Sequence, residues 1–335
     1  MDLPRLDPAL PHLADVAPAM LAAMGVAGFR PRIAMPDDVV GACLLLIDGL
    51  GAELLDTYAA DAPVLAGLRG PTLQVGFPAT TAAGLAAIGT ACRSGEHGLV
   101  GMSFRLPDVG VINALRWRPH PWGEDLRDIA VPERVQPRPT VFERAASTGV
   151  AVSVISGAEF GGSGLTRAVL RGGRYVGVHA LGELAATVRA AVADGGFCYG
   201  YHADLDLVGH LHGPGSTAWR MQLRHVDRLV ESIVEGLPSG GLVAVVADHG
   251  MVAVDGAEAV DIDATESLRD GVDAIGGEVR ARHIYTRAGA LPDVLSVWRE
   301  VLGDRAWVVT REEAIAAEWF GDLSLIHISE PTRRS

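Results

Sequence analysis

The fold is decided by the stretch Val243-Ala244-Val245-Val246-Ala247-Asp248-His249-Gly250-Met251. A short apolar run rich in β-branched residues predicts a buried strand. This run ends at once in an acid, an imidazole and a glycine. In an open α/β sheet, ligands bind outside the carboxyl ends of the parallel strands. The pattern therefore places Asp248 and His249 where a parallel strand would present them to a ligand, and a turn at Gly250 lets both side chains reach one ion.

The same pattern, an apolar strand followed by polar residues, occurs three more times along the chain. The three apolar runs are residues 41–47, 73–77 and 197–202, and the polar groups that follow them are Asp48, Thr80 with Thr81, and Asp206 with His210. Asp206 and His210 are spaced i, i+4, so a helix there would put both on one face. Thr80 and Thr81 precede a small-residue run that predicts a helix to Gly89, and the N-terminus of a helix favours an anion.

Helical patterns alternate with the predicted strands. This favours an α/β fold with a mostly parallel central sheet and helices on both faces. An amphipathic helix is predicted over residues 216–235, a further strand over 278–286 and a helix over 292–302. Residues 102–139 hold several prolines and predict an irregular loop excursion over the active face. We expect residues 1–322 to form a single catalytic domain.

The composition is that of a globular protein, with 49% hydrophobic and 21% charged residues. A formal net charge of -13 argues against binding to a nucleic-acid duplex, because such a surface needs a basic footprint. A phosphate substrate is still compatible, since bound metal ions invert the local field. The three cysteines are scattered and predict buried free thiols. Residues 1–32 lack a basic segment before an apolar core, so we expect no signal peptide, no membrane span and a cytoplasmic protein.

The four groups of polar side chains suit a metal centre that acts on phosphate. Mixed sets of aspartate and histidine favour zinc or another borderline divalent ion. Two such ions a few ångströms apart would hold a phosphoryl group from both sides. A threonine hydroxyl is a weak nucleophile alone, and coordination to a metal lowers its pKa and lets it attack. Each motif alone has a plainer explanation as a turn, an exposed histidine or a helix cap, and it is their matching placement that favours the metal centre.

Taken together, the motifs resemble those of the alkaline phosphatase superfamily, and within it the nucleotide pyrophosphatase/phosphodiesterase branch. They are Leu46-Ile47-Asp48-Gly49, Phe77-Pro78-Ala79-Thr80-Thr81 followed by Thr90 and His97-Gly98, Asp206-x-x-x-His210 with Gly213-Pro214, and Asp248-His249-Gly250-Met251. The resemblance covers about residues 41–290. It implies an alkaline phosphatase-like fold and two divalent metal ions, with Zn²⁺ the expected metal.

The resemblance also implies roles for single residues. One zinc ion would be held by Asp48, Thr81, Asp248 and His249, and a second by Asp206, His210 and one further histidine. In the family, a second threonine follows the nucleophilic one nine positions later, and Thr81 with Thr90 fits that spacing. Thr81 is therefore the expected nucleophile, and Thr80 is the alternative. The implied reaction has two displacements: Thr81 attacks phosphorus and expels the leaving group, and water then hydrolyses the phosphothreonine.

The chain departs from the family pattern next to these motifs. Family members carry an asparagine shortly after the His-Gly that stabilises a nonbridging oxygen, and Met102 stands in that place. Asn113 is a candidate replacement. The family's Phe-Pro-Asn after the nucleophile is Ala82-Ala83-Gly84 in this chain. These departures bear on substrate preference more than on the metal chemistry.

The end of the chain also departs from the family pattern. The family's last zinc ligand lies in a Gly-x-His-Gly context that does not occur after His249, and His283 is one candidate for that ligand. Residues 323–333 resemble the in-frame translation of a transposase sequencing adapter, so we take residues 323–335 as a non-native tail. On this hypothesis natural sequence stops near residue 322, the C-terminal part of the fold is truncated, and His327 is not a ligand.

The expected function is that of a metal-dependent phosphoric ester hydrolase of the phosphodiesterase or nucleotide pyrophosphatase type. Its substrate would be a small-molecule phosphate ester or a nucleotide. One alternative is a phosphomonoesterase or phosphonoacetate-type hydrolase on the same scaffold. Another is a truncated fragment with an incomplete second metal site and little activity. The sequence names neither the exact substrate nor the oligomeric state.

Overall fold

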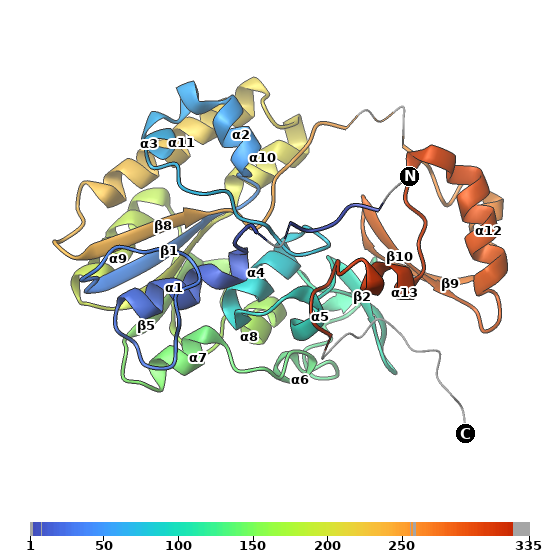
Figure 1. Cartoon of the computed structure of the whole chain (residues 1–335), viewed down its shortest axis with the longest axis horizontal. Coiled ribbons are helices and arrows are strands. Elements are labelled where there is room, and N and C mark those ends of the chain that lie inside the picture. The colour runs from blue at the N-terminus through green and yellow to red at the C-terminus, as the bar shows by residue number, and fades with distance from the viewer. Residues whose placement is uncertain (1–2, 8, 255, 257–258, 324–335) are drawn as a thin grey trace.

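A parallel five-stranded sheet lies between helices in the left part of the molecule as drawn in Figure 1. The computed structural model describes all residues except 1–2, 8, 255, 257–258 and 324–335. The strand order is β6 (Arg174–Val178), β5 (Val152–Gly157), β7 (Phe197–His202), β1 (Gly41–Ile47) and β8 (Gly241–Val246). Every neighbouring pair in this sheet is parallel. The predicted α/β fold class is therefore confirmed.

The central strand β1 is buried on both faces because its side chains alternate between two hydrophobic cores. Residues of one face pack in the first core and residues of the other face in the second: Ala42, Leu44 and Leu46 against Cys43, Leu45 and Ile47. A strand covered by helices on both sides reads as a continuous apolar run. This explains why residues 41–47 show no alternation of polar and apolar residues.

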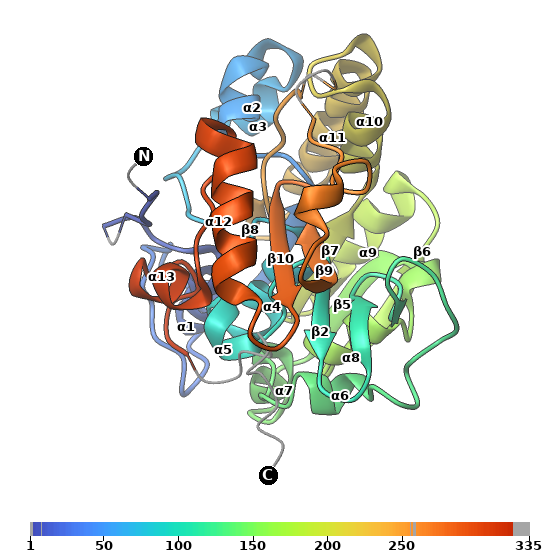
Figure 2. The same ribbon diagram turned by 90° about the vertical axis from the view of Figure 1, so that its right-hand side faces the viewer.

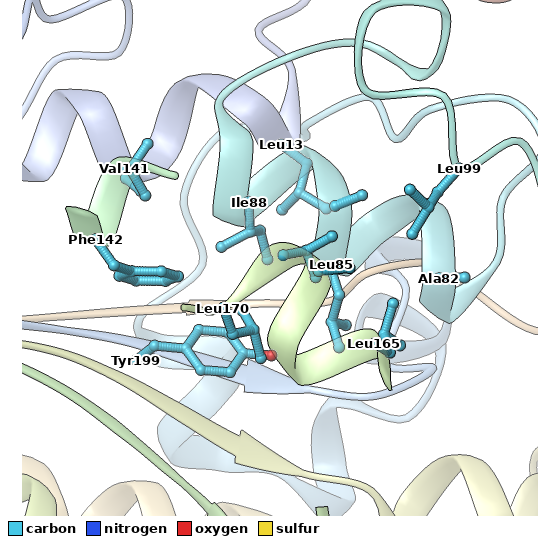
Figure 3. Packing of buried hydrophobic residues seen from close by; sticks show 14 of the residues in the cluster. Leu13, Ala82, Leu85, Ile88, Leu99, Val141, Phe142, Leu165, Leu170 and Tyr199 are labelled. Carbon is cyan, nitrogen blue, oxygen red and sulfur yellow. The ribbon is translucent and has the colours of Figure 1, made fainter. Parts of the chain in front are cut away.

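Helices cover both faces of this sheet. The first layer comprises α1 (Val16–Ala23), α4 (Thr81–Thr90), α7 (Val141–Ala146) and α8 (Gly164–Val169). The second layer comprises α3 (Pro63–Gly67), α9 (Leu181–Ala193) and α11 (Thr217–Val234), with α2 (Ala52–Thr57) and α10 (Asp204–His212) beside it. Figure 3 shows Leu85 and Ile88 of α4 packed among Phe142, Leu165 and Tyr199. This packing fixes α4, and with it the position of Thr81.

A second, antiparallel sheet corrects the prediction for residues 102–139. Its strand order is β10 (Ala281–Thr286), β9 (Val272–Glu278), β2 (Ser103–Leu106), β3 (Gly110–Asn113) and β4 (Arg118–Pro119). The segment expected to be irregular therefore contains three strands, and the short helix α6 (Pro132–Val135) follows them. Figure 2 shows α12 (Leu291–Leu302) beside β10 and β9, where Trp298 and its neighbours form a small third core.

Two predicted strands differ in the structure. Residues 73–77 form only an isolated bridge between Gln74 and His12, because their apolar side chains pack against the first core from a loop. The strand predicted over 278–286 begins later, as β10 at Ala281, because a turn after β9 precedes it; β10 pairs with β9 in the second sheet. The chain also contains the short helices α5 (Ser94–His97) and α13 (Arg311–Ala316).

Two further observations concern membrane-spanning helices and the C-terminal end of the chain. The described part of the chain holds no helix with the length and apolar character needed to cross a membrane. Residues 324–335, with His327 among them, lie outside the described residues. The hypothesis of a non-native tail therefore stays a prediction.

Candidate metal and catalytic centre

The polar groups converge at the carboxyl edge of the parallel sheet. Asp48 directly follows β1, and Asp248 with His249 follows β8, its parallel neighbour. Thr81 is the first residue of α4, and Asp206 lies in the first turn of α10. Parallel neighbours end at the same edge, so the side chains after β1 and β8 are brought together by the sheet itself.

The ring of His249 lies at the centre of this cluster. Its Nε2 atom is 3.3 Å from Thr81 Oγ1, 3.4 Å from Asp48 Oδ1 and 3.7 Å from Asp248 Oδ2. Asp48, Asp206 and His249 each offer one ligand atom, and these atoms lie within 4.8 Å of one another. The arrangement has the donor types and the spacing to hold a metal ion.

Each aspartate of the cluster has one oxygen engaged by the protein and one left free. Asp48 Oδ2 accepts a hydrogen bond of 2.5 Å from the Tyr201 hydroxyl. Asp248 Oδ1 accepts from the backbone N–H groups of Gly49 and His249 at 3.2 and 3.1 Å. By contrast, Asp48 Oδ1, Asp206 Oδ1 and Asp248 Oδ2 are buried and have no hydrogen-bond partner in the described part of the chain. Buried polar atoms are normally satisfied, so three free oxygens in one cluster fit a cation.

The charges of the cluster also fit a bound cation. Burial raises the pKa of Asp48 well above its ordinary value, and the neighbouring Asp248 and Asp206 carboxylates raise it further. Burial also raises the pKa of Asp206, while His210 and His249 act to lower it. Like charges held together in a poorly solvated site are unfavourable until a cation neutralises them.

His249 is held in the tautomer that a metal ligand needs. Its Nδ1 atom lies 3.0 Å from the carbonyl oxygen of Gly250. A carbonyl oxygen can only accept, so Nδ1 carries the hydrogen, and the Nε2 lone pair faces Thr81 Oγ1 and the cluster. Metal-binding histidines are commonly oriented in this way by a carbonyl oxygen. The donor atoms and the tautomer therefore fit a divalent ion, and the mixed carboxylate and imidazole set suits zinc.

Two glycines allow the elements to approach so closely. Gly49 has a φ of +72°, and a Cβ atom there would lie 2.9 Å from Asp206 Oδ1. Gly84 on α4 has no room for a Cβ atom, which would lie 2.5 Å from the Cβ atom of Asp248. The absence of side chains at these positions lets α10 and α4 meet the ends of β1 and β8.

The remaining predicted ligands lie at the rim of the cluster or apart from it. His210 Nε2 is 3.4 Å from Asp206 Oδ2, and the His210 side chain is 68% exposed. His283 lies in β10 of the second sheet, where its Nε2 atom is 2.6 Å from the carbonyl oxygen of Val100. His283 is not in the cluster of possible ligands among the described residues, and its role as the further ligand stays a prediction. The ligand roles of the clustered residues stay predictions.

The structure distinguishes the two threonines. Thr80 is the N-cap of α4, and its Oγ1 accepts a hydrogen bond from the N–H of Ala83 at 3.4 Å. The Thr81 hydroxyl instead faces the ring of His249. Asn113, considered as an oxyanion-stabilising group, has its amide oxygen occupied by two backbone N–H groups in the turn after β3.

Tyr201 is the residue of this site that the sequence analysis missed. It lies on β7 next to β1, with Leu46 as its register partner, and it reaches Asp48 across the strands. A signal was present, because aromatic residues occupy alternate positions 197, 199 and 201 and so share one face of the strand.

Comparisons with known proteins identify one matching family and two structures of similar fold. The model of the family described as type I phosphodiesterase / nucleotide pyrophosphatase matches residues 42–332. A solved structure of murine ectonucleotide pyrophosphatase/phosphodiesterase 5, an inactive variant in complex with AMP, is similar with a TM-score of 0.59 and 13% identity, covering 87% of this chain and 77% of that chain. A second structure of the murine protein gives 0.55 and 14%, covering 77% and 69%. At these identities the likeness shows the fold alone. A search of curated proteins gives no significant match.

Proposed function

The chain belongs to the type I phosphodiesterase/nucleotide pyrophosphatase family, a family of hydrolases, and we propose that it cleaves phosphoric esters with Thr81 as nucleophile and two zinc ions as cofactors. One observation carries the proposal: the Thr81 hydroxyl lies 3.3 Å from His249 Nε2, whose ring also meets the buried carboxylates of Asp48 and Asp248. The AMP bound to the murine relative supports a nucleotide or another small phosphate ester as substrate.

The residues divide into two sets around the proposed ions. Asp48, Thr81, Asp248 and His249 would hold one ion, and Asp206 with His210 would contribute to the other. When bound, such ions neutralise the phosphate and lower the pKa of the threonine hydroxyl.

Thr81 is well placed for the displacement itself. As the first residue of α4, it lies at the positive end of the helix dipole, which favours a phosphate group. In the proposed reaction its oxygen attacks phosphorus, and the bond to the leaving alcohol or phosphate breaks. Water then cleaves the phosphothreonine and releases the second product.

The neighbouring threonines provide a matched test. Thr81→Ala should abolish hydrolysis of a bis-aryl phosphate and prevent phosphothreonine formation, which acid quench and mass spectrometry of the wild type would detect. Thr80→Ala removes only the cap of α4, so it should cost about 1 kcal/mol of stability and leave most of the activity. Retained activity in Thr81→Ala, or its complete loss in Thr80→Ala alone, would reject the assignment.

Comparing a bis-aryl phosphate with an aryl monophosphate decides the ester class. Faster turnover of the diester supports the phosphodiesterase assignment. Faster turnover of the monoester supports the phosphomonoesterase alternative on the same scaffold. Both reactions need Thr81, so this comparison is independent of the nucleophile test.

A second candidate is a protein with an incomplete second metal site and little activity. The observation that favours it is the exposed side chain of His210. Among the described residues, the group of possible metal ligands comprises Asp48, Asp206 and His249 and does not include His210. Metal analysis separates the two candidates. About two zinc ions per chain support the hydrolase, and one or none supports the incomplete site.

A further inference from the structure

Tyr201 gives the two carboxylate oxygens of Asp48 different surroundings. Its hydroxyl donates a 2.5 Å hydrogen bond to Asp48 Oδ2. The other oxygen, Oδ1, is buried and lies 3.4 Å from His249 Nε2, and no described residue forms a hydrogen bond with it. One oxygen is therefore anchored to the neighbouring strand, and the other faces the cluster.

The ring of Tyr201 is itself held on two sides. It stacks on Tyr199 with a centroid distance of 6.4 Å and an interplanar angle of 14°. Phe160, in the short helix Ala158–Phe160, meets it edge to face at 5.9 Å and 76°. Because the ring is packed and its strand is paired to β1, the hydroxyl has a fixed position beside Asp48.

We infer that Tyr201 is a positioning residue that holds Asp48 by Oδ2, so that Oδ1 alone faces the cation. The inference rests on the proposed metal centre and adds a residue that none of the motifs contains. Without the hydroxyl, the carboxylate can rotate, and Oδ2 loses its only hydrogen-bond partner among the described residues. Groups that hydrogen-bond to metal ligands typically change metal affinity by about 10–100-fold.

Tyr199 provides a matched control. It lies two residues earlier on the same face of β7, and it too is buried. Its hydroxyl has no hydrogen-bond partner among the described residues. Tyr199→Phe therefore removes the same atom from the same strand without touching Asp48.

The test is titration of the metal-free protein with Zn²⁺ alone, using a competing chromophoric chelator to measure affinity. Tyr201→Phe should weaken zinc binding by about 10–100-fold, and Tyr199→Phe should leave it unchanged. Phe160→Ala keeps the hydroxyl but removes part of the ring packing, so it should weaken binding by a smaller factor. Unchanged affinity in Tyr201→Phe would overturn the inference, whatever Phe160→Ala does.

Hydrolysis measured across zinc concentrations gives the second readout. A positioning role predicts that the activity lost in Tyr201→Phe recovers as zinc approaches saturation, whereas a misfolded variant would not recover. Wild-type protein that binds zinc and hydrolyses the ester, with Tyr201→Phe matching it throughout, rejects the role of Tyr201 alone. Wild-type protein that binds no zinc rejects the proposed function as well.

Discussion

Gly84→Ala should uncouple the nucleophile from the metal centre without changing any polar group. Gly84 lies on α4, three residues after Thr81, and faces the end of β8. An added Cβ atom would lie 2.5 Å from the Cβ atom of Asp248, 2.9 Å from its carbonyl oxygen and 3.0 Å from its Cα atom. Two of these three are backbone atoms and cannot swing aside, so the helix or the strand end has to move.

The size of the effect follows from these distances. Ordinary van der Waals contact begins at 3.4 Å, so the closest approach is short by about 0.9 Å. A shift of this size along α4 would carry Thr81 away from His249, from the present 3.3 Å between Oγ1 and Nε2. Misplacement of a reacting group by about 1 Å can cost on the order of 10²-fold in rate. Overpacking of this kind also costs about 1–3 kcal/mol of stability.

The assay is kcat on a bis-aryl phosphate together with the thermal midpoint, at saturating zinc. Gly182→Ala is the control, since it is also a helical glycine and a Cβ atom there meets nothing within 4 Å. The control should keep full activity and lose no stability. A Gly84→Ala protein with wild-type kcat and an unchanged midpoint would show that α4 and β8 are not as tightly opposed as the structure has them.

Two further predictions concern metal and pH. Removing divalent metal with a chelator should stop hydrolysis, and zinc restored at about 100 times its dissociation constant should raise the unfolding free energy by about 2.7 kcal/mol in denaturant titrations; an equal midpoint with and without zinc would contradict the metal centre. The hydrogen bonds from Arg220 and Arg224 hold the pKa of Asp61 below its usual value. The ionised Asp61 therefore stabilises the fold above about pH 4, and this stabilisation is lost as the pH falls through the folded-state pKa. Asp61→Asn should therefore unfold more easily than wild type at pH 7, and the difference in midpoint should disappear at acid pH; a difference that persists there would mean that the Asp61 charge is not its source.

The sequence identifies the core of the site because its signals are local. Asp48 and Asp248 each follow an apolar run directly, and one strand end is enough to recognise either of them. Parallel pairing then makes their convergence predictable before any coordinates exist. Thr81 is supported by its position at the start of a helix as well as by the family pattern.

The sequence does not reveal contacts that depend on distant pairing. Tyr201 meets Asp48 across 153 residues, and the alternating aromatic residues of its strand indicate a shared face but not that partner. The short strands β2 and β3 join β9 in a second sheet. Residues 102–139 show little of the alternation between polar and apolar residues that predicts a strand. His283 is plausible as a ligand by residue type, and only the fold shows that its ring is bonded to the backbone of Val100.

The same atoms link the stability of this site to its proposed chemistry. The free oxygens of Asp48, Asp206 and Asp248 are unfavourable in the metal-free protein, because buried carboxylates repel one another and lack partners. A divalent ion removes both penalties, so part of its binding energy comes from relieving them. Replacing one of these aspartates by asparagine would relieve the repulsion and remove a ligand in the same step. Such a substitution would therefore stabilise the metal-free protein and weaken its binding of the metal ion. This gives a physical reason for the fold to keep a cluster that destabilises the metal-free protein.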